Sequence, residues 1–139
     1  MLCLVNRERA IVSAKPLILD DRLAKAAQLH SEYMALTNNF THEDEIGDLR
    51  QRITEQLFPW WVVGEIIARE FEEDEVINVI DAWMKSANHR ANILNDQYTH
   101  FGLGYKDGFW TVNFAQSTDP VQTHVPICPG NNVKIGIQL

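Results

Sequence analysis

The sequence has no long apolar run. Across its 139 residues, no stretch approaches the roughly 18 apolar residues that a helix needs to cross a bilayer, so no membrane-spanning helix is expected. The opening segment, Met1 to Arg7, also lacks the basic region, the apolar run and the small-residue cleavage site of a secretory signal peptide. We therefore expect a protein that is either intracellular or has lost its leader.

Basic residues are few and scattered. The 12 Lys and Arg residues stand against 19 Asp and Glu residues, for a formal net charge of -7 at pH 7. Nucleic acids and anionic lipid surfaces are bound by basic side chains gathered on one face, so both partners are disfavoured. The densest charge cluster, Glu70 to Glu75, precedes an amphipathic segment. It indicates a solvated helix N-terminus, since the residue spacing of an EF-hand calcium loop is missing.

Cysteine is limited to Cys3 and Cys128, near opposite ends of the chain. A disulfide between them would close a loop of more than a hundred residues and stabilise the fold by up to about 4 to 5 kcal/mol. Two free buried thiols fit the sequence equally well, and both alternatives stay open. Asn39-Phe40-Thr41 is a glycosylation sequon, which matters only if the source is a secreting eukaryote.

What remains is the composition of an ordered globular domain. Hydrophobic residues make up 45% of the chain and charged residues 22%, close to the average for such domains. The length is near the common size of one domain. We therefore expect a single domain over residues 1–139, with an irregular tail over about residues 118–139 that contains Pro126, Pro129 and Gly130.

Periodicity and turn signals predict the order of the elements. Amphipathic helices are expected at residues 2–12, from Asp20 or Asp21 to Asn38, at 48–56 and at 76–86, with a short helical turn capped by Asn88 and running to Leu94. Strand-like runs lie at 60–67, 99–105 and 109–115, the last two joined through an Asp107-Gly108 turn. Helices around an antiparallel hairpin predict the α/β class, a three-layer α/β/α sandwich with a small, mainly antiparallel central sheet.

Two of the five histidines are candidates for a functional site. His30 lies on the apolar stripe of the second helix and is expected to be a satisfied core residue, while His100 and His124 have incidental settings. His42 follows a helix end in a loop, and His89 opens a short helix. Binding groups concentrate in such positions on a rigid scaffold.

Glu65 is the candidate acid, because it interrupts an apolar run. A buried carboxylate costs several kcal/mol unless a cation or a hydrogen-bond donor meets it. An imidazole is a natural partner, and a salt bridge to Arg52 or Arg90 satisfies the same requirement.

Six spaced blocks then resemble one family, the CAP superfamily, whose domain is also called SCP. The blocks, in chain order, are Leu4-Val5-Asn6-x-x-Arg9, Pro16-Leu17-x-x-Asp20-x-x-Leu23-x-x-Ala26-Ala27-x-x-His30-Ser31-x-x-Met34, Phe40-Thr41-His42, Gly64-Glu65-x-x-Ala68, Trp83-Met84-x-Ser86-x-x-His89-Arg90-x-Asn92-Ile93-Leu94 and Gly102-x-Gly104. The resemblance covers about residues 1–117 and is closest in character to the short microbial members, fungal or bacterial.

The resemblance implies a central cleft lined by two His and two acidic residues. His42, Glu65 and His89 match three of these positions. Ser86 stands where many eukaryotic members have a Glu, and Ile66 replaces an Asn that commonly follows the first acid. The expected cleft therefore holds three ionisable side chains and one hydroxyl.

Members of this superfamily look like secreted binding proteins, so an extracellular monomer is expected, possible targets being a host or cell-wall component. No cofactor is required. Zn²⁺ is expected to bind weakly to His42 and His89, with Glu65 either as a further ligand or as the group that orients one ring. A small lipid, such as a sterol or fatty acid, is the other expected ligand, and Phe58, Trp60 and Trp61 are the apolar cluster that motivates it.

Two alternatives use the same residues differently. In a hydrolase, Ser86 would be the nucleophile, His89 the base and Glu65 the group that orients it, but a Ser before a short helix is more often a cap. The sequence also lacks the His-Glu-x-x-His and Gly-x-Ser-x-Gly motifs. In a pure interaction module the cleft would be vestigial and a surface loop would contact the partner.

Overall fold

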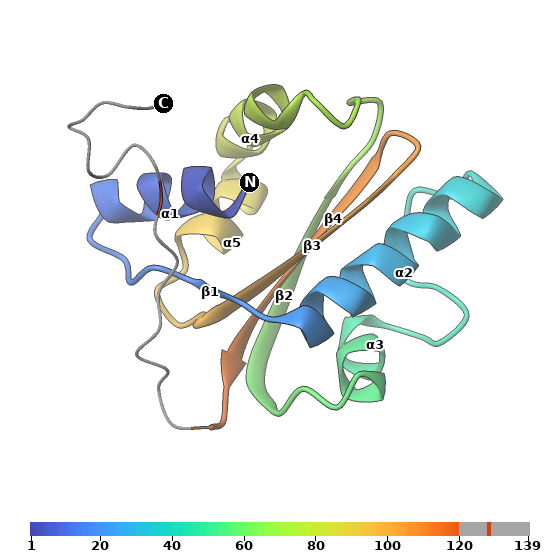
Figure 1. Ribbon diagram of the computed structural model, residues 1–139, viewed down its shortest axis with the longest axis horizontal. Coiled ribbons are helices and arrows are strands. Elements are labelled where there is room, and N and C mark those ends of the chain that lie inside the picture. The colour runs from blue at the N-terminus through green and yellow to red at the C-terminus, as the bar shows by residue number, and fades with distance from the viewer. Residues whose placement is uncertain (120–127, 129–139) are drawn as a thin grey trace.

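A four-stranded sheet lies between two groups of helices (Figure 1). The computed structural model describes residues 1–119 and 128, and the fold class predicted from the sequence is confirmed. The elements are α1 (Leu2–Ile11), β1 (Ile18–Leu19), α2 (Asp21–Thr37), α3 (Leu49–Glu55), β2 (Trp60–Ala68), α4 (Val76–Met84), α5 (Ala87–Leu94), β3 (His100–Lys106) and β4 (Phe109–Ser117).

The sheet has the strand order β1-β3-β4-β2, so that β1 and β2 form its edges. β4 pairs antiparallel with both β2 and β3, and β1 pairs parallel with β3. The predicted hairpin is present: Asp107 and Gly108 have φ values of 47° and 87°, the left-handed pair that a tight two-residue turn requires. The sequence did not predict β1, which contains only two residues.

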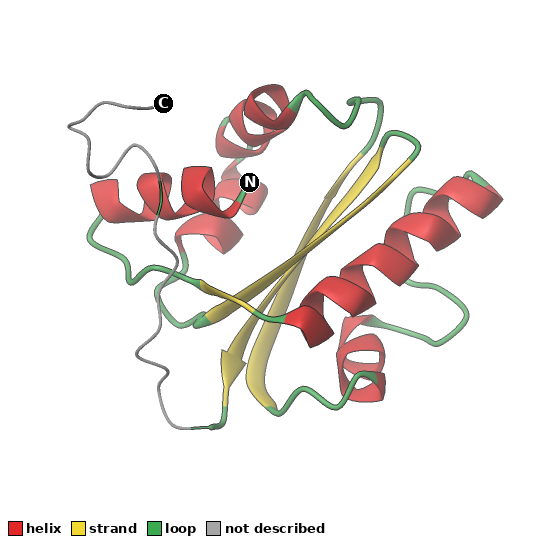
Figure 2. Cartoon of the chain, viewed as in Figure 1, coloured by secondary structure: helices red, strands yellow, loops and turns green. Residues whose placement is uncertain are grey.

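The two faces of the sheet carry different cores, as Figure 2 shows for the helices on either side of the strands. Alternating strand side chains pack against α1, α4 and α5 on one face and against α2 and α3 on the other. On β4, Val112 and Phe114 face the first group, whereas Asn113 and Ala115 face the second. Gly102 lets α2 approach β3, since a Cβ there would lie 2.2 Å from the α2 backbone.

Side-chain caps mark the start of α2 and α3, whereas α1, α4 and α5 begin without a capping hydrogen bond from a side chain. Asp20 caps α2 and Asp48 forms a capping box on α3, while Asn38 ends α2 in the left-handed conformation. The prediction that Asn88 caps the fifth helix is wrong. Ser86 occupies the N-cap position, although its hydroxyl makes no capping hydrogen bond, and Asn88 lies within the first turn.

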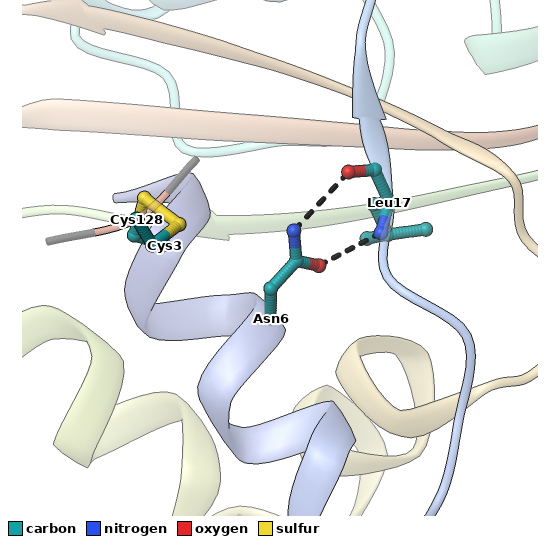
Figure 3. Close-up of a disulfide and its surroundings, with 4 residues drawn as sticks. All are labelled: Cys3, Asn6, Leu17 and Cys128. Atoms are coloured by element: carbon teal, nitrogen blue, oxygen red, sulfur yellow. Dashed lines mark hydrogen bonds between the residues drawn. A yellow bond between two sulfur atoms is a disulfide. The ribbon is translucent and has the colours of Figure 1, made fainter. Parts of the chain in front are cut away.

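Cys3 and Cys128 form a disulfide, which decides between the two cysteine alternatives (Figure 3). On the same helix, the Asn6 side chain binds the backbone of Leu17 through both ends of its amide group. Nδ2 donates to the Leu17 carbonyl at 3.1 Å, and Oδ1 accepts from the Leu17 N–H at 2.8 Å. These contacts tie α1 to the segment that enters β1.

The predicted tail lies mostly outside the described residues, as does His124. Within the part of the chain that the structure describes, no helix combines the length and the apolar character needed to cross a bilayer.

Candidate functional site

Glu65 lies at the centre of the candidate site, in the edge strand β2. The alternation of β2 directs its side chain to the α2 and α3 face, where only 2% of the side chain is exposed. Arg52, one turn before the end of α3, donates from Nη1 to Oε2 at 2.8 Å and from Nη2 to Oε1 at 3.0 Å. This two-bond geometry is the strongest way in which a protein neutralises a buried carboxylate.

Asn113 completes the surroundings of Glu65 from the neighbouring strand. The two residues are register partners on β2 and β4. With its amide oriented to satisfy both ends, Asn113 donates to Glu65 Oε2 at 2.9 Å and accepts from the Ala27 backbone N–H at 3.2 Å. Asn113 on β4 therefore supplies a polar contact to Glu65, while Ile66 packs in the core on the opposite face of the sheet.

His42 approaches Glu65 from the loop between α2 and α3. Its Nδ1 lies 2.9 Å from Glu65 Oε1, and its backbone carbonyl accepts from Arg52 Nη2 at 2.6 Å. The ring is 60% exposed, so the backbone is held while the outer edge of the imidazole faces solvent. The hydrogen bond to Glu65 raises the pKa of His42 above its ordinary value, against an opposing effect of partial burial.

The pKa of Glu65 moves the other way. Burial works to raise it, but the hydrogen bonds from His42 and Arg52 outweigh burial and hold the pKa below its ordinary value. Glu65 is therefore an ionised carboxylate with both oxygens occupied.

His89 projects from the first turn of α5, in the other helical layer. Its Nδ1 lies 2.8 Å from Ser86 Oγ. Burial lowers the pKa of His89, and the charge of His42 lowers it further. A groove of about 260 Å³ beside His42 is lined by His42, Val63 and Glu65 together with residues 43 and 48–50, and His89 is not among its lining residues.

The structure thus brings His42 and Glu65 into contact and pairs His89 with Ser86. Glu65 contacts His42, Arg52 and Asn113, and none of its polar contacts is to His89. The hydrolase arrangement, in which Glu65 orients His89, is therefore not assembled. Among residues 1–119 and 128, no three His, Cys, Asp or Glu side chains converge as a metal-ligand set.

Other candidates have structural settings. His30 is fully buried and hydrogen-bonded at both ring nitrogens, as expected of a satisfied core residue. Of the three aromatic residues near α3, Phe58 is in the core and Trp60 donates to Thr54 Oγ1. Trp61 alone is largely exposed, at 67%, beside the register shift between Trp60 and Val62.

Sequence reasoning named Arg52 only as an alternative to an imidazole, and both contact Glu65. It missed Asn113 and Asp44. Asn113 carried a weak signal, since it is a polar residue in a strand-like run opposite another strand. Asp44 carried none, because its partner His30 is 14 residues away on a helix.

Comparison with known proteins identifies the family. The model of the CAP family, described as the cysteine-rich secretory protein family, matches residues 2–114. The chain belongs to this family. Two curated relatives come from Bacillus subtilis (strain 168). The uncharacterized protein YkwD is 36% identical over 114 residues, 80% of this chain and 44% of YkwD. The uncharacterized membrane protein YlbC is 33% identical over 98 residues, 70% of this chain and 28% of YlbC.

Solved bacterial structures share the CAP fold. An extracellular protein containing an SCP domain from Bacillus anthracis is 31% identical with a TM-score of 0.79, covering 84% of this chain and 39% of that one. A cysteine-rich secretory protein from Staphylococcus aureus is 25% identical with a TM-score of 0.69, covering 84% and 37%. An outer surface protein of Borrelia burgdorferi, at 22% identity and a TM-score of 0.74, shows the fold alone. The chain spans less than half the length of its two curated relatives.

Proposed function

We propose that this CAP domain is an extracellular binding module whose cleft holds Zn²⁺ weakly between His42 and His89. One observation carries the proposal: each ring has its Nδ1 engaged by a neighbour, Glu65 Oε1 at 2.9 Å for His42 and Ser86 Oγ at 2.8 Å for His89. Both imidazoles therefore have Nε2 available. Metal-binding histidines in proteins commonly use one nitrogen for the metal while the other donates to a carboxylate or another oxygen.

Glu65 orients His42 and is not itself a ligand in this proposal. Both its oxygens already accept from Arg52 and His42, so coordination would require breaking a buried ion pair. Ser86 gives His89 the corresponding support, its hydroxyl accepting from Nδ1–H. A Ser in this place lets the ring stay neutral, the form in which Nε2 binds a metal.

Two imidazoles leave a Zn²⁺ ion with open coordination positions. Tight structural zinc sites use four protein ligands, and no third ligand converges here in the part of the chain that is described. We expect affinity in the micromolar range or weaker, with water or an oxygen of a second ligand completing the coordination.

The extracellular location is supported from two directions. The Cys3–Cys128 disulfide suits an oxidising compartment, since disulfides are rare in most cytosolic proteins. The Bacillus anthracis relative is described as extracellular. The same disulfide joins α1 to a residue beyond β4, which supports the proposal that the chain forms a single domain.

Calorimetric titration with Zn²⁺ tests the metal proposal. We expect the wild-type protein to bind and the double variant H42A/H89A to lose the binding heat. The variant E73Q is the matched control, because it removes charge from the acidic loop before α4 without touching the cleft. Equal binding in the wild type and the double variant would contradict the proposal and favour partner recognition through the surface, with a host or cell-wall component as the target.

Small lipids are a second candidate ligand, on the evidence of the exposed Trp61. Trp is enriched at binding interfaces relative to the rest of the protein surface. A fluorescent sterol or fatty acid added to the delipidated protein should quench its Trp fluorescence. The variant W61A should lose this quenching, and the variant W60F should retain it. No uptake by the wild type would remove this candidate.

A further inference from the structure

His30 lies beside the candidate site, and the proposed metal chemistry makes no use of it. The ring sits on α2 and is completely buried, with 0% of it exposed. Nε2 lies 2.6 Å from the carbonyl oxygen of Thr41, and Nδ1 lies 2.9 Å from Asp44 Oδ2. These two partners stand on either side of His42 in the loop.

Both partners are acceptors, which constrains the protons of the ring. A backbone carbonyl has no proton to give, so Nε2 of His30 must carry one to bind Thr41. An ionised carboxylate likewise only accepts, so Nδ1 must carry a proton to bind Asp44. A neutral ring has one proton and can satisfy only one of the two contacts.

The other contacts of Asp44 fit a carboxylate and leave no acceptor for a carboxylic acid proton. Oδ1 accepts from the backbone N–H groups of Ile46 at 2.9 Å and Gly47 at 3.4 Å. Oδ2 lies 3.4 Å from Arg52 Nε. Since every neighbour is a donor, the proton shared by the pair belongs on the His30 ring.

We propose that His30 is a positioning residue held as a buried imidazolium, and that it fixes the loop on both sides of His42 so that the His42 ring meets Glu65. The loop has no helix or strand of its own between Asn38 and Asp48. Residues outside the loop hold it through the two His30 contacts, the Arg52 bond to the His42 carbonyl and the Glu65 bond to the His42 ring.

The charges along this path alternate in sign. His30 faces Asp44, Asp44 faces Arg52, and Arg52 faces Glu65. A buried charge is tolerated only when it is paired and hydrogen-bonded, so the cation on His30 and the carboxylate of Asp44 require each other. Loss of His30 would leave Asp44 Oδ2 with only the 3.4 Å contact to Arg52 Nε and release the loop that carries His42.

Nitrogen-15 spectra of the histidine side chains in the metal-free wild-type protein test the proton assignment. Because both partners are acceptors, we expect both ring nitrogens of His30 to carry protons in the folded protein. His100 is the matched control: it is also buried, but its Nδ1 lies 2.7 Å from the hydroxyl of Thr99, which can donate, so one ring proton suffices. A His30 ring with one unprotonated nitrogen would overturn the proposal, and no variant is needed to find it.

The variant H30Q tests the positioning role, with H100Q as its control. Gln retains a donor for the Thr41 carbonyl and lacks the nitrogen that faces Asp44. We expect H30Q, and not H100Q, to lose the proton signal of His42 Nδ1–H in its hydrogen bond to Glu65. Zn²⁺ affinity, which rests on the proposed function, should fall about tenfold or more.

The two readouts separate the two proposals. If the wild-type protein binds no Zn²⁺, the metal proposal fails while the His42 signal still reports on His30. If H30Q leaves that signal and the affinity unchanged, the positioning role is wrong even where the metal proposal holds. Should H30Q not fold, the wild-type spectrum still decides whether His30 is the buried cation on which the role depends.

Discussion

Replacing Arg52 with Met removes the cation from the centre of the site and leaves Glu65 buried. Both side chains are only 2% exposed and are joined by two short hydrogen bonds. Removing one member of such a pair costs about 3 to 5 kcal/mol, because the other charge stays buried without its partner. Since domains are stable by about 5 to 15 kcal/mol, R52M should lose about a fifth or more of the total.

Urea unfolding of the oxidised protein measures this loss. With a slope of about 1 to 3 kcal/mol per molar urea, the midpoint of R52M should fall by about 2 M. R22M is the matched control, since Arg22 also binds a carboxylate, Asp20, through two hydrogen bonds but is 44% exposed. It should lose about 1 kcal/mol or less.

A double-mutant cycle with E65Q isolates the pair. Because the two residues are in contact, we expect R52M/E65Q to be destabilised by clearly less than the sum of the single variants. Equal losses in R52M and R22M, or strict additivity in the cycle, would refute the claim that burial makes the Arg52–Glu65 pair indispensable.

Three further measurements address the rings, the disulfide and the packing. NMR titration of the metal-free protein should place the pKa of His42 above the ordinary 6.5 and that of His89 below it; the reverse order would be wrong for this geometry. A raised pKa stabilises the fold only while the ring is protonated, so the contribution of His42 is full below about pH 6.5 and is lost as the pH rises through its folded value. Reduction of Cys3–Cys128, which are 125 residues apart, should cost up to about 5 kcal/mol in urea unfolding, and an unchanged midpoint would contradict this. G102A, whose Cβ would lie 2.2 Å from the α2 backbone, should cost about 1 to 3 kcal/mol by the same assay, whereas a neutral effect would show that α2 can shift.

Helices and the hairpin could be predicted because their signals are local. The buried stripe of α2 and the Asp107-Gly108 turn each depend on residues that are close together in the sequence. β1 could not be predicted, since its two residues become a strand only by pairing with β3, about 80 positions later. The start of α5 was ambiguous for a different reason: Ser86 and Asn88 are both good capping residues, and the helix begins after the first.

The candidate site divides in the same way. The cost of burying Glu65 predicted that it needs a cationic or hydrogen-bonding partner, and this could be read from β2 alone. The sequence could not show that an imidazole and a guanidinium both contact Glu65. His42 lies on a loop and Arg52 on a helix, and the approach of both to β2 depends on the fold. The contact between Asn113 and Glu65 depends on the register of β4 against β2. A shift of the register by one residue would turn the Asn113 side chain to the other face of the sheet.

Two motif residues outside the candidate site, Arg9 and Gly102, fix the helical layers on the two faces of the sheet. His42 is held from the α2 and α3 layer, and His89 stands on α5 in the opposite layer. Arg9 on α1 donates to the carbonyl oxygens of Ile93 at 2.8 Å and Asn95 at 2.9 Å, at the end of α5, and so fixes the helix that carries His89. Gly102 seats α2 on the other face. These contacts hold the two helical layers on opposite faces of the sheet, which explains why residues far apart in sequence and in space belong to the same pattern.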